Sequence, residues 1–154
     1  MDFETFFRDE GLSLGRALYL LTGDRSEAEE LLQEAMARAY ERWDRVQRLE
    51  SPAGYVYKTA LNLFRRRARR AALRPRAPTR EAPDPADVAG ARRDLSQALA
   101  SLSREQREAL VLVEWLEFTA EEAAGVLGIK PSSVRTRVHR AKNAIRARLG
   151  DRDV

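Results

Sequence analysis

Residues 119 to 149 read Thr119-Ala-Glu-Glu-Ala-Ala-Gly-Val-Leu-Gly-Ile-Lys-Pro-Ser-Ser-Val-Arg-Thr-Arg-Val-His-Arg-Ala-Lys-Asn-Ala-Ile-Arg-Ala-Arg-Leu149. Thr119 followed by Glu122 has the pattern of a capping box, which predicts a short helix that stops at Gly128. Pro131, at a plausible first helical position, predicts a second helix that runs to Leu149. Glycine at position 128 can adopt the left-handed conformation that a sharp turn between two helices needs. The segment therefore predicts a helix-turn-helix.

The second helix of this motif divides into an apolar face and a basic face. Apolar residues recur at i, i+4, i+7 and i+11 and are expected to point inward: Val134, Val138, Ala141 and Ile145. The opposite face carries hydrogen-bond donors and no acid: Ser132, Arg135, Thr136, His139 and Asn143, flanked by Arg140, Lys142 and Arg146. Such a helix can enter the major groove, where Arg135 can read a guanine edge while Ser132 and Ser133 hold phosphate. We predict DNA binding over the alternative, an ordinary basic surface helix of a bundle.

Two further helices are expected upstream, in the same C-terminal module. The first covers about residues 92–102. Ser103 with Gln106 is another capping box, which opens a helix through Leu110, Val113 and Leu116. With the helix-turn-helix, the module has four predicted helical segments.

A linker is predicted over residues 73–91, because four of the six prolines lie between Pro75 and Pro85 in a stretch without apolar periodicity. It divides the chain into helical modules at residues 1–72 and 92–150. No alternating strand pattern is found. The predicted fold class is therefore all-α, with two small helical domains joined by a Pro-rich linker and a helix-turn-helix in the C-terminal one.

Three helices are predicted in the N-terminal module. The first is marked by Phe3, Phe6, Phe7, Leu14, Leu18 and Leu21 and ends at Gly23. Ser26 with Glu29 reads as a capping box that opens the second, which is expected to run to about Val46 with a buried stripe of Leu32, Met36, Ala39, Tyr40 and Trp43. The third begins at Ser51-Pro52, turns Val56, Ala60 and Leu63 inward, and continues into Arg65-Arg-Arg-Ala-Arg-Arg70.

The composition excludes several classes of function. The 154 residues include no Cys and one His, which excludes a Cys/His zinc site, a disulfide framework and a thiol nucleophile. Paired carboxylates, a metal cluster and a phosphate-cradling glycine loop are also missing, so neither an enzyme nor a cofactor is predicted. No run of about 18 apolar residues exists and the N-terminus is acidic, so we expect a soluble, cytoplasmic protein without membrane insertion.

Charges are segregated along the chain. Residues 24–34 hold five acids and one Arg, residues 65–80 hold eight Arg and no acid, and residues 130–148 hold seven Lys or Arg and no acid. Two basic blocks on a nearly balanced background suggest two contacts with a polyanion, most simply nucleic acid. The alternative is solvated helix faces in an Arg-rich proteome, which 25 Arg against 3 Lys supports.

The third predicted helix interleaves aromatic and basic residues: Tyr55-Val-Tyr-Lys-Thr-Ala-Leu-Asn-Leu-Phe-Arg-Arg-Arg-Ala-Arg-Arg70. Rings that stack on exposed bases and cations that hold the backbone are what a single-stranded DNA surface needs. The alternative is that the aromatics belong to the core, and we expect this for Phe64 and for one of Tyr55 and Tyr57.

These segments together resemble the extracytoplasmic-function (ECF) sigma factors of bacterial RNA polymerase. Leu21-Thr-Gly-Asp-Arg-Ser-Glu-Ala-Glu-Glu-Leu-Leu-Gln-Glu34 is similar to the family's second conserved region, and the third helix resembles its promoter-melting region. Two further segments resemble the family's fourth conserved region: Leu102-Ser-Arg-Glu-Gln-Arg-Glu-Ala-Leu110 and Val134-Arg-Thr-Arg-Val-His-Arg-Ala141. Leu20-Leu-Thr-Gly-Asp24 and Arg38-Ala-Tyr-Glu-Arg-Trp43 are typical of the actinobacterial-type branch.

The resemblance implies a factor that binds core RNA polymerase and directs promoter recognition and melting. In the family the acidic second helix docks on a coiled coil of the polymerase's largest catalytic subunit, which implies core-binding roles for Glu30, Gln33, Glu34 and Arg38. The third helix and the preceding loop, residues 47–51, would capture flipped bases of the −10 element through Tyr55, Lys58, Asn62, Arg65 and Arg66. The last helix would read the −35 element as duplex through Ser132, Ser133, Arg135, Thr136, His139 and Arg140.

The sequence departs from the family at two of these positions, and two other interpretations stay open. Family members commonly carry an acid near Arg66 and often Trp where Tyr55 stands. One alternative is a helix-turn-helix regulator that binds DNA without polymerase, and another is a sigma-like decoy for an anti-sigma factor. An anti-sigma factor is also a candidate partner of a true sigma factor, in addition to core polymerase and promoter DNA.

Overall fold

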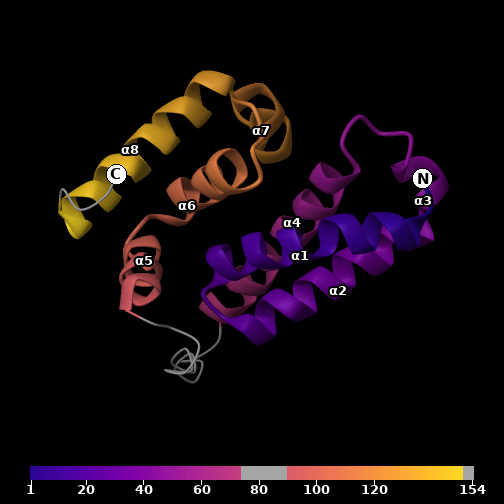
Figure 1. Cartoon of the computed structure of the whole chain (residues 1–154), viewed down its shortest axis with the longest axis horizontal. Coiled ribbons are helices and arrows are strands. Elements are labelled where there is room, and N and C mark those ends of the chain that lie inside the picture. The colour runs from indigo at the N-terminus through magenta and orange to yellow at the C-terminus, as the bar shows by residue number, and fades with distance from the viewer. Residues whose placement is uncertain (74–89, 151–154) are drawn as a thin grey trace. The chain divides into compact units, whose positions relative to one another are not determined.

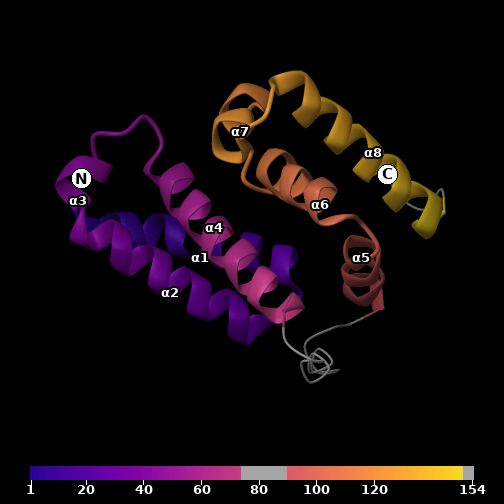
Figure 2. The same ribbon diagram turned by 180° about the vertical axis from the view of Figure 1, so that it is seen from behind.

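The computed structural model describes residues 1–73 and 90–150, so most of the predicted linker lies outside the described residues. Every regular element in these two ranges is a helix, which confirms the all-α prediction. The chain divides into two compact units, an N-terminal unit within Met1–Glu81 and a C-terminal unit within Ala82–Val154. Figure 1 shows the helices of each unit, and Figure 2 shows them from behind.

The N-terminal unit is built from four helices, α1 (Phe3–Thr22), α2 (Arg25–Glu41), α3 (Trp43–Val46) and α4 (Pro52–Ala72). The helix α2 packs against both α1 and α4, so one core forms between the three long helices. That core is apolar and fully buried at its centre: Leu14, Leu18, Leu21, Leu31, Val56, Tyr57 and Leu61. The predicted inward residues of α4, Val56, Ala60 and Leu63, are all buried.

The first helix ends as predicted at Gly23. Its φ of 72° is the left-handed conformation that glycine adopts at low cost, and its N–H donates to the carbonyl of Tyr19 at 2.8 Å. The turn leaves the next residue, Asp24, in an extended conformation with φ −135°.

The predicted N-cap of α2 is wrong, because Asp24 rather than Ser26 caps this helix. The Oδ1 of Asp24 accepts a hydrogen bond from the N–H of Glu27 at 3.1 Å, and the helix already begins at Arg25. The turn at Gly23 makes Asp24 the first extended residue, so Ser26 falls inside the first helical turn. Both residue types are good N-caps, and the backbone conformation decides between them.

Replacement of Asp24 tests this assignment. We expect Asp24→Ala to lower the free energy of unfolding by about 1 kcal/mol, because the N–H of Glu27 loses its acceptor. The matched control, Ser26→Ala, is expected to change it by less than about 0.5 kcal/mol. Urea denaturation of the full chain, followed by circular dichroism, measures both, and a larger loss in the control would contradict the assignment.

The predicted second helix also differs from the structure at its end. It stops at Glu41, and Arg42 with φ −117° and ψ 25° separates it from the short α3. Tyr40, predicted as buried, is 65% exposed. The buried positions of α2 are Ala28, Leu31, Ala35, Met36 and Ala39.

Aromatic rings of α1 contact Tyr40 of α2 and Trp43 of α3. Trp43 lies with its ring centroid 5.1 Å from that of Phe6, and its Nε1–H donates to the carbonyl of Met1 at 3.2 Å. The Tyr40 ring meets Phe3 edge-on at 5.1 Å, so it is partnered by a ring although it remains at the surface. Phe7, one of the predicted markers of the first helix, is 46% exposed.

The C-terminal unit contains α5 (Gly90–Ala100), α6 (Arg104–Leu110), a π-helical turn η2 (Val111–Trp115), α7 (Ala120–Leu127) and α8 (Pro131–Leu149). The long α8 packs against α5, α6 and α7. The helix predicted from Ser103 does not continue as an α-helix to Leu116, because it widens into the π turn at Val111. The N–H of Leu116 there donates to the carbonyl of Val111 at 3.0 Å.

Both capping boxes predicted in this unit are confirmed. Ser103 and Gln106 exchange hydrogen bonds of 3.1 and 3.3 Å, and Thr119 and Glu122 exchange bonds of 3.1 and 3.0 Å. The hydrogen bonds that the Glu122 carboxylate receives from Thr119 hold the pKa of Glu122 below its ordinary value. The start of α7, the first helix of the predicted helix-turn-helix, is therefore fixed by local contacts.

Candidate nucleic-acid and polymerase interfaces

The helix-turn-helix is present as the sequence predicts. Gly128 ends α7 with φ 69° and ψ 33°, and its N–H donates to the carbonyl of Ala124 at 2.8 Å. Pro131 occupies the first turn of α8, where its missing N–H leaves no donor unsatisfied. Ile129, between the two helices, is half-buried. The tight turn joins α7 to α8, a helix of 19 residues.

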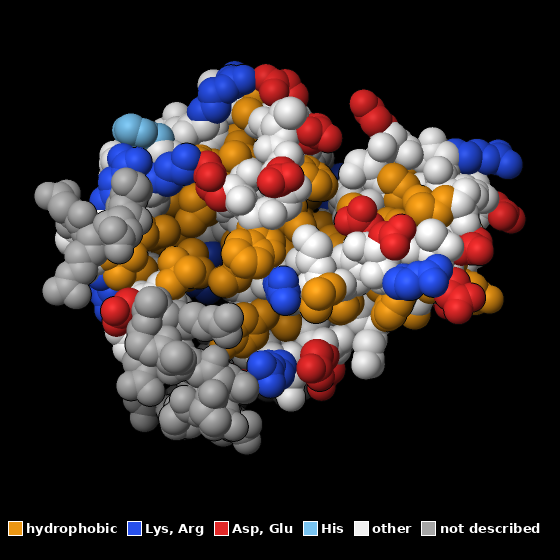
Figure 3. All heavy atoms as spheres, viewed as in Figure 1, with side chains coloured by type: hydrophobic (Ala, Val, Ile, Leu, Met, Phe, Trp, Pro, Cys, Tyr) orange, Lys and Arg blue, Asp and Glu red, His pale blue; other side chains and the backbone are white. Residues whose placement is uncertain are grey.

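The two faces of α8 match the predicted phase. Val134, Val138 and Ala141 are buried and Ile145 is half-buried. The predicted reading residues lie on the outer side, where all are exposed except Ser133, which is half-buried: Ser132, Ser133, Arg135, Thr136, His139 and Arg140. Lys and Arg side chains gather over α8 in Figure 3, whereas acidic side chains gather over α7.

Two cations on α8 have acidic partners that sequence spacing did not reveal. Arg135 Nη2 lies 2.5 Å from Glu121 Oε1 of α7, and Lys142 Nζ lies 2.5 Å from Glu114 Oε1 of η2. Both pairs are solvent-exposed, with 60% of the Arg135 side chain and 64% of the Glu121 side chain accessible. Exposed pairs of this kind contribute little stability. In this structure the guanidinium of Arg135 is therefore turned toward α7.

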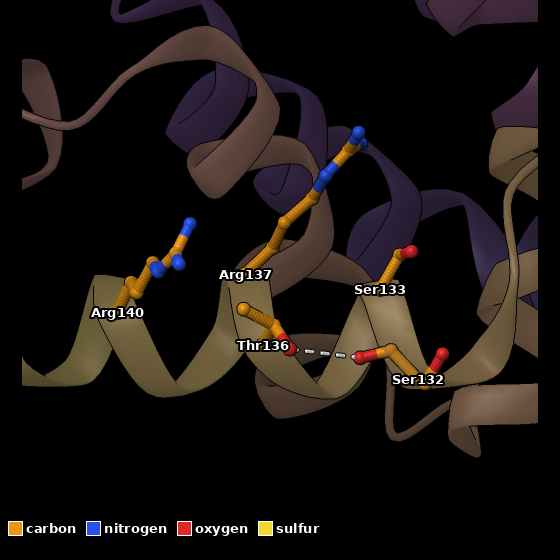
Figure 4. A pocket seen from close by; sticks show the side chains of 5 residues that line it. All are labelled: Ser132, Ser133, Thr136, Arg137 and Arg140. Carbon is orange, nitrogen blue, oxygen red and sulfur yellow. Dashed lines mark hydrogen bonds between the residues drawn. The ribbon is translucent and has the colours of Figure 1, made fainter.

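A shallow hollow of about 250 Å³ lies along the first turns of α8 (Figure 4). It is lined by hydroxyl and guanidinium groups and no acid: Ser132, Ser133, Thr136, Arg137 and Arg140. The hydroxyl of Thr136 donates to the carbonyl of Ser132 at 3.0 Å, so its oxygen is left to accept. Arg137 was not predicted as a site residue. The signal that could have identified it is its position in the basic block at residues 130–148. Hydroxyls and guanidinium groups around one hollow suit a phosphate group.

His139 and Asn143 form a polar pair on the outer face of α8. Nδ2 of Asn143 lies 3.2 Å from Nε2 of His139. Both side chains are exposed, so they add hydrogen-bonding groups to the outer face of α8.

A polar stripe runs along α4. Its predicted residues recur at i, i+3, i+7, i+10 and i+11, which places them on one side of the helix: Tyr55, Lys58, Asn62, Arg65 and Arg66. Lys58, Asn62 and Arg66 are exposed, whereas Tyr55 and Arg65 are half-buried. Tyr57 and Phe64 are buried, so the expectation that one tyrosine and Phe64 belong to the core is confirmed. Arg69, which was not predicted, is exposed three residues beyond Arg66 and extends the stripe.

The acidic residues of α2 form an ion-pair network rather than a row of separate charges. Arg67 of α4 reaches both Glu30 Oε2, 3.2 Å from Nη1, and Glu34 Oε2, 3.3 Å from Nη2. The other oxygen of Glu34 lies 3.1 Å from Arg38 Nη2. Gln33 is exposed on the same helix. The structure thus brings Glu30, Glu34 and Arg38 together through Arg67, which was not a predicted site residue and belongs in sequence to the arginine run at 65–70.

Within residues 1–73 and 90–150, no group of three or more His, Cys, Asp or Glu side chains is placed to hold a metal ion. No helix in the described ranges combines the length and apolar character needed to span a membrane.

Comparisons with known families identify both units. Residues 6–74 match the family model "Sigma-70 region 2", and residues 92–145 match "Sigma-70, region 4". The RNA polymerase sigma-E factor of Streptomyces coelicolor is 31% identical over 159 aligned residues, which cover 100% of this chain and 89% of that protein. The ECF RNA polymerase sigma factor SigL of Mycobacterium tuberculosis is 29% identical, over 88% of this chain and 82% of its own length.

Solved structures show the same fold. The sigma factor RpoE of Bartonella quintana, crystallised with the anti-sigma factor NepR, matches with a TM-score of 0.81 at 24% identity, covering 97% of this chain and 99% of that one. CnrH in complex with the cytosolic domain of CnrY matches with a TM-score of 0.69 at 21% identity, over 98% and 89% of the two chains. By its two matched regions and its relatives, the chain belongs to the sigma-70 family, in the ECF group of RNA polymerase sigma factors. Members of this family are transcription initiation factors rather than enzymes.

Proposed function

We propose that the chain works as a promoter-specificity factor with its tasks divided between the two units. Residues 1–72 bind core RNA polymerase and the −10 element, and residues 92–150 bind the −35 element. Residues 73–91 join them and thread through the polymerase toward the RNA exit path. The polymerase carries out nucleotidyl transfer, and the chain acts in the cytoplasm, where promoter DNA and polymerase are found.

Recognition of the −35 element is assigned to the outer face of α8. Its exposed donors suit the guanine and adenine edges of the major groove, with Arg135 as the bidentate reader. Ser132, Ser133 and Thr136 line the hollow at the start of the helix, and their hydroxyls would hold phosphate. His139 and Arg140 continue the same face toward the next bases or the backbone.

Recognition of the −10 element is assigned to the stripe on α4. Tyr55 supplies a half-buried ring on which a base can stack, and Asn62 supplies an amide that can pair with a base edge. Lys58, Arg65 and Arg66 supply the charge that holds the single strand. Because Tyr57 and Phe64 are in the core, stacking in this helix falls to Tyr55 alone.

Polymerase docking is assigned to Glu30, Gln33, Glu34 and Arg38 of α2. The observation that carries the proposal is the arrangement of the N-terminal unit, in which an acidic network on α2 and a basic stripe on α4 both lie on the surface of one three-helix unit. A DNA-binding unit has no use for the acidic network, whereas a unit that binds both polymerase and DNA uses both. An anti-sigma factor is a further proposed partner, by analogy with the Bartonella quintana complex.

The test is DNA binding with and without polymerase. We expect a promoter duplex to be shifted by the chain together with core enzyme, and only weakly by the chain alone at physiological salt. A DNA-only regulator would bind the duplex equally well without polymerase. A decoy would bind an anti-sigma factor but neither DNA nor core enzyme.

A further inference from the structure

Arg67 stands apart from the other arginines of the basic run in α4. Arg66 and Arg69 are exposed on the outer side of the helix, in line with Asn62. Arg67 follows Arg66 by one residue, a rotation of about 100° around the helix, and points instead toward α2. Two-thirds of its side chain is covered, since 34% is accessible. The arginines of this run therefore point in two directions: Arg66 and Arg69 outward, and Arg67 toward α2.

The guanidinium of Arg67 joins two carboxylates that lie one turn apart. Nη1 lies 3.2 Å from Glu30, and Nη2 lies 3.3 Å from Glu34, so one planar fork bridges both. Arg38 lies 3.1 Å from the remaining oxygen of Glu34. The four side chains therefore form one chain of charges that crosses from α4 to α2.

This network orients the side chains of Glu30 and Glu34 but adds little to the stability of the fold. The Glu30 side chain is 67% accessible and the Glu34 side chain 40% accessible, and ion pairs as exposed as these contribute little to folding. Long side chains that are already held in one conformation lose less entropy when a partner binds. The ion pairs of Arg67 with Glu30 and Glu34 would therefore affect the binding of a partner to this surface more than they affect folding.

We infer that Arg67 is a positioning residue for polymerase docking, which presents Glu30 and Glu34 to core enzyme in a fixed arrangement. The inference rests on the proposed docking function of α2. It assigns Arg67 to the protein interface, whereas its neighbours Arg65 and Arg66 stay with the stripe proposed to bind the −10 element. In α4, only the residues of the polar stripe are then proposed to contact bases.

The first part of the test compares two arginines of the same helix. Arg67→Gln is expected to raise the Kd of the full chain for core RNA polymerase about fivefold, through lost preorganisation. The matched control Arg70→Gln removes the same charge from an exposed position and is expected to stay within about twofold. Arg67→Lys keeps the charge but loses the planar guanidinium, and its Kd is expected to lie between those of Arg67→Gln and Arg70→Gln. Fluorescence titration with core enzyme measures each Kd.

The second part asks whether Arg67 acts through the glutamates. In a Glu30→Gln, Glu34→Gln background, Arg67→Gln is expected to raise the Kd by less than about twofold more, because the groups it positions are gone. A further fivefold rise would mean that Arg67 contacts polymerase directly or acts through the fold, and would overturn the inference. Thermal unfolding of each variant is expected to shift by no more than about 2 °C, as exposed pairs predict.

The outcomes separate this inference from the docking function on which it rests. If Glu34→Gln alone leaves the Kd unchanged, the docking face itself is wrong, and the inference is overturned with it. If Glu34→Gln weakens binding but Arg67→Gln does not, the docking face stands and the positioning role is overturned. If Glu34→Gln and Arg67→Gln each raise the Kd, and their effects are not additive when combined, both the docking face and the positioning role are supported.

Discussion

Arg135→Ala is expected to weaken promoter binding by the polymerase complex by about 1–3 kcal/mol and to relax specificity at one position of the −35 element. Arg135 is exposed on the outer face of α8, and the fork of its guanidinium matches the O6 and N7 acceptors of guanine. Its removal also leaves Glu121 without this cation, at a surface that approaches phosphates. The measurement is competition binding against promoters that carry each single-base change in the −35 element.

The control for this variant is Arg148→Ala, which removes the same charge from the last turn of the same helix. We expect it to lower affinity slightly and equally for every promoter, as loss of a non-specific charge does. The Arg135 variant should instead lose discrimination between bases. An unchanged pattern of base preference would remove Arg135 from the reading face.

Charge reversal at Glu34 is expected to weaken binding to core polymerase by about 2 kcal/mol or more, which is roughly 30-fold in Kd. Glu34 connects Arg38 and Arg67, so a lysine there breaks two ion pairs and places three cations together. The fold is expected to remain intact, because these pairs are solvent-exposed and the core of α2 is unaffected. Titration with core enzyme and a circular dichroism melt measure the two effects.

Glu29→Lys is the matched control for Glu34→Lys. It makes the same change of charge in the same helix, at an exposed position five residues earlier and therefore rotated by about 140° from Glu34. We expect its Kd to stay within about threefold of the unchanged chain. Normal binding by Glu34→Lys, or equal weakening by both variants, would show that the docking face is misplaced.

The sequence predicted elements best where local chemistry fixes them. The capping boxes at Ser103 and Thr119 and the left-handed Gly128 are each determined within a few residues, and all are present. At Asp24 and Ser26 two residues suited to capping lie close together, and the turn at Gly23 selects Asp24. The spacing of Ser26 and Glu29, which predicted the cap, does not register how the backbone leaves that turn.

The placement of aromatic residues depended on contacts across the chain. Tyr40 fits a three- and four-residue pattern with Met36, yet it lies at the surface against Phe3 of another helix. Ala39 is buried as predicted, and two alanines that the predicted stripe omits, Ala28 and Ala35, are buried as well. A periodicity that favours large apolar residues cannot tell a buried alanine from an exposed one.

The same distinction holds for the candidate sites. The outer face of α8 was predictable because one helical phase orders it from Ser132 to Arg140. The partners of Arg135 and Arg67 were not, since they lie 14 residues away in Glu121 and 33 and 37 residues away in Glu34 and Glu30. No helical spacing encodes such pairs, and only packing of one helix on another creates them.

Transcription in vitro tests the central claim most directly. Core polymerase free of sigma factor is supplied with fragmented genomic DNA of the source organism, with and without this chain, and the 5′ ends of the transcripts are mapped. We predict new transcripts that begin at discrete sites and share two upstream motifs, which would be the −10 and −35 sequences. If the folded chain gives no new starts, it is not a promoter-specificity factor, and duplex binding without polymerase would then separate a DNA-only regulator from a decoy.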